Sequence, residues 1–389
     1  MPLFVHVLGL AVFAQGTSEF MLSGLVPGIA RDLRVSVGAA ASLTSAYAIG
    51  MMAGAPVMAA LSARWPRRRA LAGFLTAFVV VHAVGAVTAD FAVLFATRVV
   101  AAIANAGFLA VAMSAAASLV PPAKRARATA VLLSGVTLSC VAGVPAGAWL
   151  GHWSGWRAAF WAVAVLCLPA LAFVFRSAPA DAAHRRDVSV RREVRALRTR
   201  PVRVALVLAA AVNGATFATF AYLAVLTTDV ARLPEGAVPA LLAGFGAGAF
   251  AGVTVAGRTG DGRLRRGVVV SLCVLPLGWA ALASAGARSA ALFAVLVVVQ
   301  GGLSFGVGAT LVNRVMHVAS DAPSMGGSFA TVALNAGAFL GPLLAGAVTG
   351  TTGDHRDAAW VSAALAATAL AVAAVARSGA ARPVGTDAA

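Results

Sequence analysis

Long apolar runs that contain almost no charged residues follow one another through most of this chain of 389 residues. They reach about 20 residues, which is the length a helix needs to cross the hydrocarbon core of a bilayer. Hydrophobic residues make up 60% of the chain and charged residues only 11%, whereas soluble proteins carry about 25% charged residues. Polar surface is therefore too scarce for a soluble protein of this size, and we expect an integral membrane protein.

The runs are continuous rather than short and alternating, which predicts spanning helices and not a membrane β-barrel. Twelve spans are predicted near residues 4–25, 39–61, 70–87, 92–113, 128–150, 158–175, 204–225, 237–256, 268–285, 290–312, 326–348 and 358–375. The predicted fold is all-α, with two pseudo-symmetric six-helix bundles at residues 1–175 and 204–376. A basic cytoplasmic linker, 176–203, joins the bundles, and a tail, 377–389, follows them.

The basic residues are spread unevenly over the predicted loops. Of 30 lysines and arginines, 23 lie in the tail and in the loops after even-numbered spans, while 6 lie in the opposite loops. Because positively charged loops stay on the cytoplasmic side, both termini are predicted to be cytoplasmic in a multi-pass protein of the cell membrane. This topology accounts for most of the net charge of +17, so the charge does not indicate binding to nucleic acid.

The two predicted halves carry matching features at corresponding positions. A tight basic turn follows the second span of each half, with Arg64, Arg67 and Arg68 in the first copy and Asp261 and Arg263 in the second. Glycine and proline interrupt the fifth span of each half, as GVPAG from residue 143 and as GPLLAG from residue 341. Such matching interruptions are typical of secondary transporters that are built from internal repeats.

With these features the chain resembles the major facilitator superfamily over its full length. The superfamily's turn signature is approximately GxxxDRxGR(R/K), and here Ala59, Ala63 and Pro66 stand where Gly, Asp and Gly are expected. The residues Gly143, Pro145 and Gly147 resemble the signature of the family's antiporters. The resemblance implies that these three residues, with the turn residues named above, take part in the conformational change of transport.

The first predicted span resembles one particular group within the superfamily. The stretch QGTSEFM at residues 15–21, followed by GLVP at 24–27 and IARDL at 29–33, resembles the twelve-span drug:proton antiporters. Blocks 9–27, 64–71 and 104–112 are similar to chloramphenicol-resistance exporters of that group, including the unusual pair Trp65-Pro66. The resemblance is denser before residue 176 than after it. It implies proton-coupled export of a neutral amphiphilic antibiotic, most specifically chloramphenicol, by alternating access.

Glu19 is the one acidic residue that lies well inside a predicted span, and Arg98 is the one deeply placed base. A carboxylate in hydrocarbon costs several kcal/mol, so a role in transport is the default hypothesis for Glu19. At about 1.5 Å per residue, both residues are expected at similar depth in the outer half of the membrane. We predict that they couple protons, either as a direct pair or through water. The alternative for Arg98 is a stabilising partner of backbone carbonyls.

Further polar and aromatic residues are predicted near the middle of the spans. A neutral, drug-sized substrate fits a lining of mixed aromatic and hydrogen-bonding groups, and the predicted substrate-binding residues are Gln15, Tyr47, Asn105, Asn213, Phe217, Phe220 and Asn335. Hydrogen bonds between helices, or simple packing, explain any one of them equally well. His82 is interpreted as a packed histidine rather than a proton relay.

Other functions are weighed against transport of a drug. Within transport, the alternatives are export of a different antibiotic, a sugar or a metabolite, and facilitated movement without proton coupling. An enzyme is disfavoured because no catalytic motif such as HExxH or GxSxG is present and the loops are short. We predict no cofactor and no metal, with a drug, protons and membrane lipid as partners of a monomer.

Overall fold

The computed structural model describes residues 2–62, 65–121, 124–177, 199–258, 261–285, 288–319 and 326–378. The first half of the chain contains α1 (Leu3–Phe20), α2 (Leu22–Leu33), α3 (Val37–Ser62), α4 (Arg67–Val87), α5 (Phe91–Ser118), α6 (Arg125–Leu138), a π-helix (Ser139–Gly143), α7 (Val144–Ser154) and α8 (Trp156–Ser177). We call these helices the N-half. Most of the predicted linker and tail, and Arg64, lie outside the described residues.

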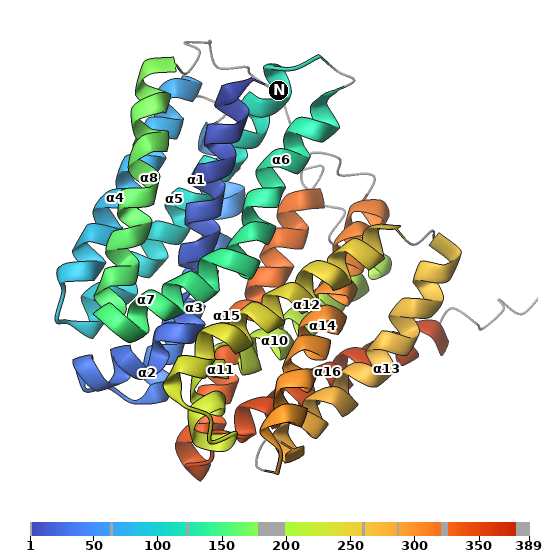
Figure 1. The fold of residues 1–389 in the computed structure, drawn as a ribbon. Helices are drawn as coiled ribbons and strands as arrows, with labels where there is room; N and C mark the ends of the chain where they lie inside the picture. Colours follow the sequence, from blue (N-terminus) through green and yellow to red (C-terminus); the bar gives the residue numbers. More distant parts are fainter. Residues whose placement is uncertain are drawn as a thin grey trace, which may run out of the picture.

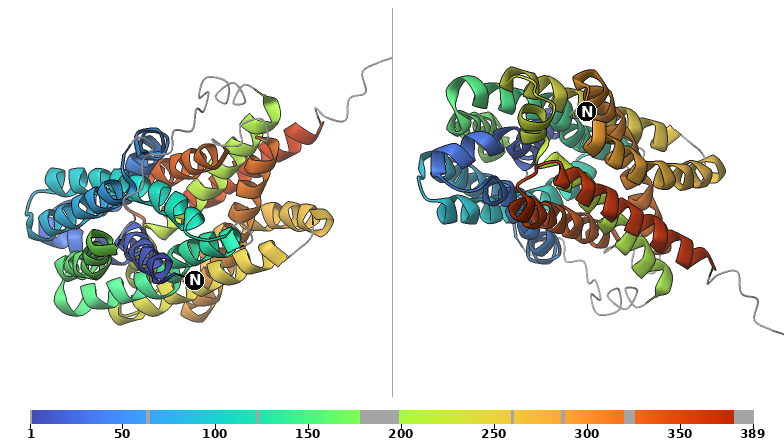
Figure 2. Two further views of the ribbon diagram at one scale, coloured as in Figure 1. Left: turned by 90° about the horizontal axis from the view of Figure 1, so that it is seen from above. Right: turned by 90° about the horizontal axis from the view of Figure 1, so that it is seen from below.

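The second half repeats this arrangement and is called the C-half. It contains α10 (Arg200–Phe220), α11 (Leu223–Val225), a π-helix (Leu226–Val230), a 3-10 turn (Glu235–Ala237), α12 (Val238–Arg258), α13 (Asp261–Ala285), α14 (Ala290–Val318), α15 (Gly326–Thr352) and α16 (Asp357–Ser378). Figures 1 and 2 show the two halves as bundles that lie side by side, the N-half in blue to green and the C-half in yellow-green to red.

The predicted membrane fold is confirmed. In the part of the chain that is described, eleven helical segments are long and apolar enough to span a bilayer, and a twelfth apolar segment, Val270–Ser284 of α13, is shorter. The predicted first span, 4–25, is divided in the structure into α1 and α2, and helical structure continues to Leu33. The predicted seventh span, 204–225, is divided in the same way after Phe220. The corresponding first helices of the two halves are thus both interrupted.

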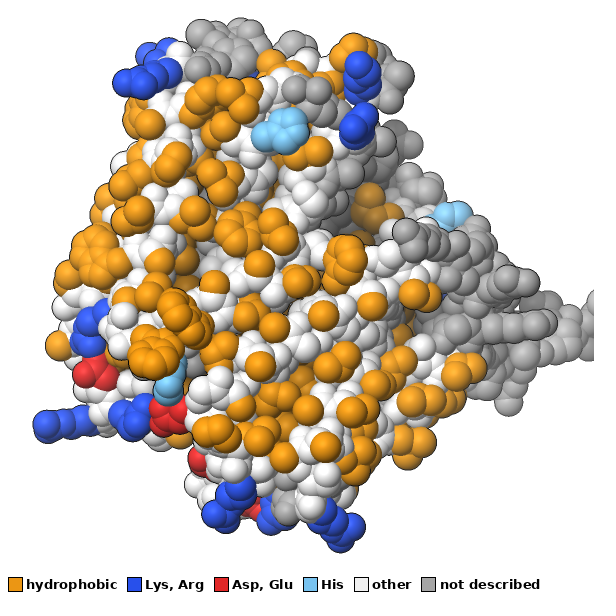
Figure 3. Space-filling model, viewed as in Figure 1, with side chains coloured by type: hydrophobic (Ala, Val, Ile, Leu, Met, Phe, Trp, Pro, Cys, Tyr) orange, Lys and Arg blue, Asp and Glu red, His pale blue; other side chains and the backbone are white. Residues whose placement is uncertain are grey.

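The surface has the pattern that a bilayer requires. Hydrophobic side chains cover the middle of the face seen in Figure 3, whereas its charged side chains gather towards the two ends. Large apolar side chains are exposed on the surface of the protein, among them Trp153, which is 71% exposed, and Leu277, which is 69% exposed. A surface of this kind is stable against lipid and would aggregate in water.

The two halves meet mainly away from the N-terminus. We call the end that carries the connections around residues 34–36, 88–90 and 231–237 the distal end; it is the lower end in Figure 1. There α3 packs against α15, and Gly38 and Gly346 allow the two backbones to approach closely. Deeper in the interface, the Ser45 hydroxyl donates a hydrogen bond to the Phe339 carbonyl at 2.8 Å. The distal end of the interface is therefore closed in this conformation.

Candidate functional site

Glu19 lies one residue before the end of α1, where the helix is interrupted. Its side chain is half-buried, and among the described residues no hydrogen bond or ion pair of its carboxylate is found. Three groups lie close enough to act on it electrostatically: Arg98 on α5, Tyr47 on α3 and Cys140 in the π-helix. A carboxylate in this position has electrostatic neighbours but no fixed partner.

Arg98 is almost fully buried and has found other acceptors than Glu19. One guanidinium nitrogen donates to the Ser18 hydroxyl at 2.8 Å, and the other donates to the Ser18 carbonyl at 2.7 Å. The guanidinium carbon also lies 4.7 Å from the centre of the Tyr47 ring and 5.6 Å from that of Phe160. These contacts offset the cost of burying the charge. A direct ion pair with Glu19, one of the two predicted arrangements, is not formed in this conformation.

His82 on α4 completes this buried cluster. Its Nε2 atom lies 2.6 Å from the Ser18 hydroxyl, and its Nδ1 atom lies 2.7 Å from the Phe78 carbonyl. The imidazole is also packed between the rings of Phe78 and Phe160, as the sequence interpretation of a packed histidine expects. Sequence reasoning missed Ser18 as a partner of Arg98, because a serine in a spanning helix carries no signal beyond its place next to Glu19.

The predicted substrate-binding residues of the N-half occupy buried positions. Asn105 donates a hydrogen bond to the Tyr47 hydroxyl at 2.9 Å, so these two residues are brought together. Gln15 is completely buried, and neither its amide nitrogen nor its amide oxygen has a hydrogen-bond partner among the described residues. An unpartnered buried amide is costly, and such a group is expected to gain a partner in another state or from a ligand.

The predicted residues of the C-half fall into two groups. Asn213 donates to the Leu334 carbonyl at 2.7 Å, and Asn335 donates to the carbonyl of Thr331, one turn back in its own helix, at 3.0 Å. Both amides therefore have backbone partners within the C-half. Phe217 and Phe220 instead belong to an aromatic cluster, whose rings are those of Phe20, Phe217, Phe220, Phe245 and Phe305.

The aromatic cluster crosses the interface between the halves. The rings of Phe20 on α1 and Phe217 on α10 have centres 6.0 Å apart. With Cys140 and Thr216, the cluster lines a cavity of about 10 Å³, which has room for about one water molecule. The seven predicted residues thus do not line one open pocket in this conformation, and their role in substrate binding stays a prediction.

The glycine and proline residues of the fifth span lie at a break in the helix. Gly143 is the last residue of the π-helix between α6 and α7, and a side chain there would overlap the Thr17 side chain on α1. Pro145 has no backbone N–H, so it cannot continue the regular hydrogen-bond pattern of the helix. Gly147 faces Met21 at the interruption between α1 and α2. Short π-helical segments inside α-helices are frequent at functional sites.

The basic turn residues lie at the end of the molecule opposite to the distal end. Arg68 donates a hydrogen bond to the Phe175 carbonyl at the end of α8. Arg67 also has an interaction partner. In the second copy, Asp261 begins α13 and Arg263 lies in its first turn. The role of these residues in the conformational change stays a prediction.

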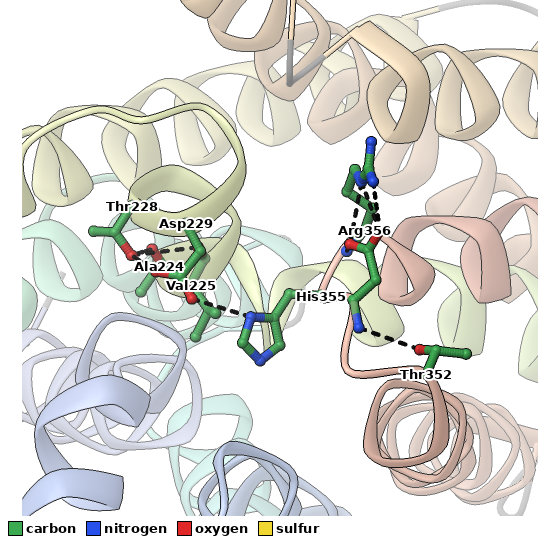
Figure 4. A network of polar contacts seen from close by, with 8 residues as sticks. Ala224, Val225, Thr228, Asp229, Thr352, His355 and Arg356 are labelled. Atoms are coloured by element: carbon green, nitrogen blue, oxygen red, sulfur yellow. Dashed lines mark hydrogen bonds and ion pairs between the residues drawn. The ribbon is translucent and has the colours of Figure 1, made fainter.

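Charged residues hold the distal end together. Glu235 of the C-half lies 3.5 Å from Arg31 on α2 and 3.7 Å from His152 on α7, so one acidic residue reaches two helices of the N-half. We call these three residues the distal ion-pair cluster. Within the C-half, Figure 4 shows His355 pointing at Asp229, with 3.0 Å between Nδ1 and the carboxylate. In the N-half, hydrogen bonds from Arg157 and Trp156 lower the pKa of Asp32.

Two interrupted bundles of membrane-spanning helices that meet at a distal interface are the architecture of a membrane transporter. The sequence model of the Major Facilitator Superfamily matches residues 8–333. The chain belongs to the Major Facilitator Superfamily, and the family marks it as a multi-pass membrane transporter rather than an enzyme.

Relatives of known name support this assignment. The chain is 54% identical over 376 residues to the chloramphenicol resistance protein of Streptomyces lividans, with 96% of each chain covered. It is 35% identical to the inner membrane transport protein YdhP of Escherichia coli, covering 88% of this chain and 87% of that protein. It is also 32% identical to a chloramphenicol efflux pump of Mycobacterium tuberculosis, covering 88% and 84%.

Solved structures with the same fold are much more distant in sequence. A bacterial homologue of the human lysosomal transporter Spinster, in an inward-facing and occupied conformation, superposes with a TM-score of 0.72 at 16% identity, covering 96% of both chains. The nucleoside transporter NupG superposes with a TM-score of 0.74 at 12% identity, covering 97% of this chain and 98% of that chain. At these identities the likeness shows the fold alone.

Proposed function

We propose that this protein exports a neutral, aromatic, drug-sized antibiotic, with chloramphenicol as the first candidate, in exchange for protons. The substrate class is supported by the names of two relatives, of which the more similar is 54% identical and aligns over nearly the whole of both chains. It also agrees with the aromatic rings of Phe20 and Phe217 between the halves and with the neutral hydrogen-bonding pair of Asn105 and Tyr47 in the N-half.

The observation that carries the proton coupling is the state of Glu19. Its carboxylate is half-buried in the membrane region and has no fixed partner among the described residues, while the nearest buried cation is bonded to Ser18. A carboxylate without a partner in an apolar protein is unstable as an anion, so it gains from binding a proton. Loss of that proton when a drug binds would link the two fluxes.

The closed distal end gives a direction to the cycle. If both termini are cytoplasmic, as the distribution of basic loops predicts, the conformation described here is closed towards the outside. Opening of the distal end would release the drug and let Glu19 take a proton from outside. Return to the present conformation would release that proton into the cell.

The test is drug efflux from intact cells. We expect cells that express the protein to accumulate several times less chloramphenicol than control cells, and we expect a proton uncoupler to abolish this difference. Glu19→Gln should behave like the uncoupled protein, because a neutral amide cannot exchange a proton. Asp357→Asn, which changes an acidic residue at the start of α16, is the matched control and should export normally.

The outcomes separate the alternatives. Chloramphenicol accumulation that is unchanged by expression would rule out this substrate, and other neutral antibiotics, sugars and metabolites would then be tested in the same assay. Movement of the drug down its own gradient that ignores an imposed pH gradient would show a facilitator without proton coupling. Full proton-driven efflux by Glu19→Gln would exclude Glu19 as the proton carrier.

A further inference from the structure

The buried histidine on α4 takes part in a hydrogen-bond chain whose direction can be worked out. A carbonyl oxygen only accepts hydrogen bonds, so the 2.7 Å contact between His82 Nδ1 and the Phe78 carbonyl requires a hydrogen on Nδ1. In a neutral ring, Nε2 then carries a lone pair and is an acceptor. The group that donates to it at 2.6 Å is the Ser18 hydroxyl.

The same hydroxyl is an acceptor for Arg98. A guanidinium nitrogen only donates, so the 2.8 Å contact places a lone pair of Ser18 Oγ towards Arg98. All hydrogen bonds in the chain therefore run one way, from Arg98 to Ser18, from Ser18 to His82, and from His82 to the backbone of α4. A second guanidinium contact, 3.4 Å from Nε2, agrees with an acceptor at that nitrogen.

A charged imidazole would break this arrangement. Its Nε2–H would donate to the Ser18 oxygen, so the Ser18 hydroxyl hydrogen would lose its acceptor on His82, and two positive groups would lie 3.4 Å apart in a buried site. Among the described residues, Arg98 is the charged group in contact with His82, and the rings of Phe78 on α4 and Phe160 on α8 pack against the imidazole. The neutral ring with hydrogen on Nδ1 is the form that satisfies every contact.

We propose that His82 is a positioning residue for proton coupling: through the Ser18 hydroxyl, its ring holds the Arg98 guanidinium on the Ser18 side of α1 and away from Glu19. The proposal rests on the proposed function, because it assumes that Glu19 is the proton carrier. It explains why Arg98 Nε, which is buried, has no acceptor here among the described residues. That donor is available to Glu19 in another conformation.

Loss of the acceptor on His82 has a defined consequence. Without it the Ser18 hydroxyl can rotate, which loosens one of the two hydrogen bonds between Arg98 and Ser18 and leaves only the bond to the Ser18 carbonyl unchanged. The guanidinium can then approach the carboxylate of Glu19 more easily. A closer positive charge favours the ionised carboxylate, so protonation of Glu19 needs a more acidic solution. The other electrostatic neighbours of Glu19, Tyr47 and Cys140, carry groups that are normally neutral below pH 8.

The first experiment measures chloramphenicol binding to the purified protein as a function of pH. Protons compete with the drug at an antiporter, so binding falls on acidification with a measurable midpoint. We expect His82→Leu to move this midpoint down by about one pH unit, within the range produced by a nearby charge. His82→Gln has a side-chain oxygen that can accept from Ser18, and it should restore the original midpoint.

Two further measurements keep this proposal separate from the proposed function. In a Glu19→Gln background, His82→Leu should cause no shift, whereas a persisting shift would assign the effect to another group. Nitrogen NMR of the full-length protein, with the His82 signals identified by their loss in His82→Gln, should show a neutral ring with hydrogen on Nδ1 at pH 7. A doubly protonated ring, or hydrogen on Nε2 alone, would overturn the proposal even if Glu19 proves to be the proton carrier.

Discussion

Ser18 and Glu19 are consecutive residues of α1, yet their side chains lie in different surroundings. Ser18 is fully buried and binds Arg98 and His82 within the N-half, while Glu19 is half-buried and lies near Cys140 at the interface. Successive side chains of a helix point about 100° apart, because 3.6 residues complete one turn. Ser18 therefore lies in a fixed hydrogen-bond network, whereas the carboxylate of the next residue, Glu19, has no fixed partner and can bind and release a proton.

Asp32 at the distal end illustrates an ion pair that depends on pH. It accepts hydrogen bonds from Arg157 and from Trp156 Nε1, the latter at 2.9 Å, and both lower the pKa of its carboxyl. A folded-state pKa below the unfolded value of about 3.9 means that the stabilisation is complete above that pH and is lost as the pH falls through the folded value.

We predict that Asp32→Asn lowers the free energy of unfolding by about 1 kcal/mol or less at pH 7, since the pair is partly exposed to solvent. The difference from the parent protein should be smaller at pH 3, because the stabilisation is lost as the pH falls below the unfolded value. Unfolding of the purified protein in detergent at the two pH values measures it, and a double-mutant cycle with Arg157→Met isolates the pair. An equal loss at both pH values would show that the charge is not responsible.

At the scale of elements, the interrupted fifth span of the N-half forms part of the interface. The π-helix between α6 and α7 brings the Cys140 carbonyl against Gly246 on α12. A side chain at position 246 would overlap this carbonyl. Backbone contact of this kind needs glycine on the opposing helix. We therefore expect this contact between the irregular segment and α12 to separate when the distal end opens.

Gly246→Ala tests this contact. The added methyl group would overlap the Cys140 carbonyl, and overpacking of a well-packed interface costs about 1–3 kcal/mol. We predict that the variant shifts the conformational equilibrium at least fivefold away from the distal-closed state and slows export. Gly73→Ala on α4, where an added methyl group meets no atom within 4 Å, is the matched control. Normal export by both variants would contradict the prediction.

At the scale of the whole molecule, the two bundles are held at the distal end by few charged contacts and by close packing of α3 on α15. Glu235 is the acidic member of the distal ion-pair cluster, and its partners Arg31 and His152 come from separate helices. The side chains of Arg31 and Glu235 are 70% and 53% exposed, so their ion pair contributes only about 0.2–1 kcal/mol. We call this weak contact between the halves a latch. A weak contact suits an interface that must open in every transport cycle.

Removal of one latch residue should be measurable but modest. We predict that Arg31→Gln shifts the equilibrium towards the distal-open state by up to about fivefold, and that 1 M salt reduces the difference. Arg34→Gln, which removes an equal charge three residues further along, is the control. Distances between spin labels at Trp153→Cys and Thr352→Cys, in protein without its native cysteines, report the opening. Equal distances in both variants would show that Arg31 is not a latch.

The local composition of the sequence was enough to predict the spanning helices of this protein and its buried acidic residue. The long apolar runs predicted the spanning helices and the two bundles, and Glu19 was identified as the buried acid, because hydropathy and charge are read residue by residue. Which groups the buried polar and aromatic side chains contact was decided only by the tertiary structure. Arg98 contacts Ser18 instead of Glu19, Asn213 and Asn335 bond to backbone carbonyls, and Phe20 joins Phe217 across the interface. These choices depend on how each helix is rotated and interrupted against its neighbours. That rotation is set by close packing of small residues from distant parts of the chain, which no single segment encodes.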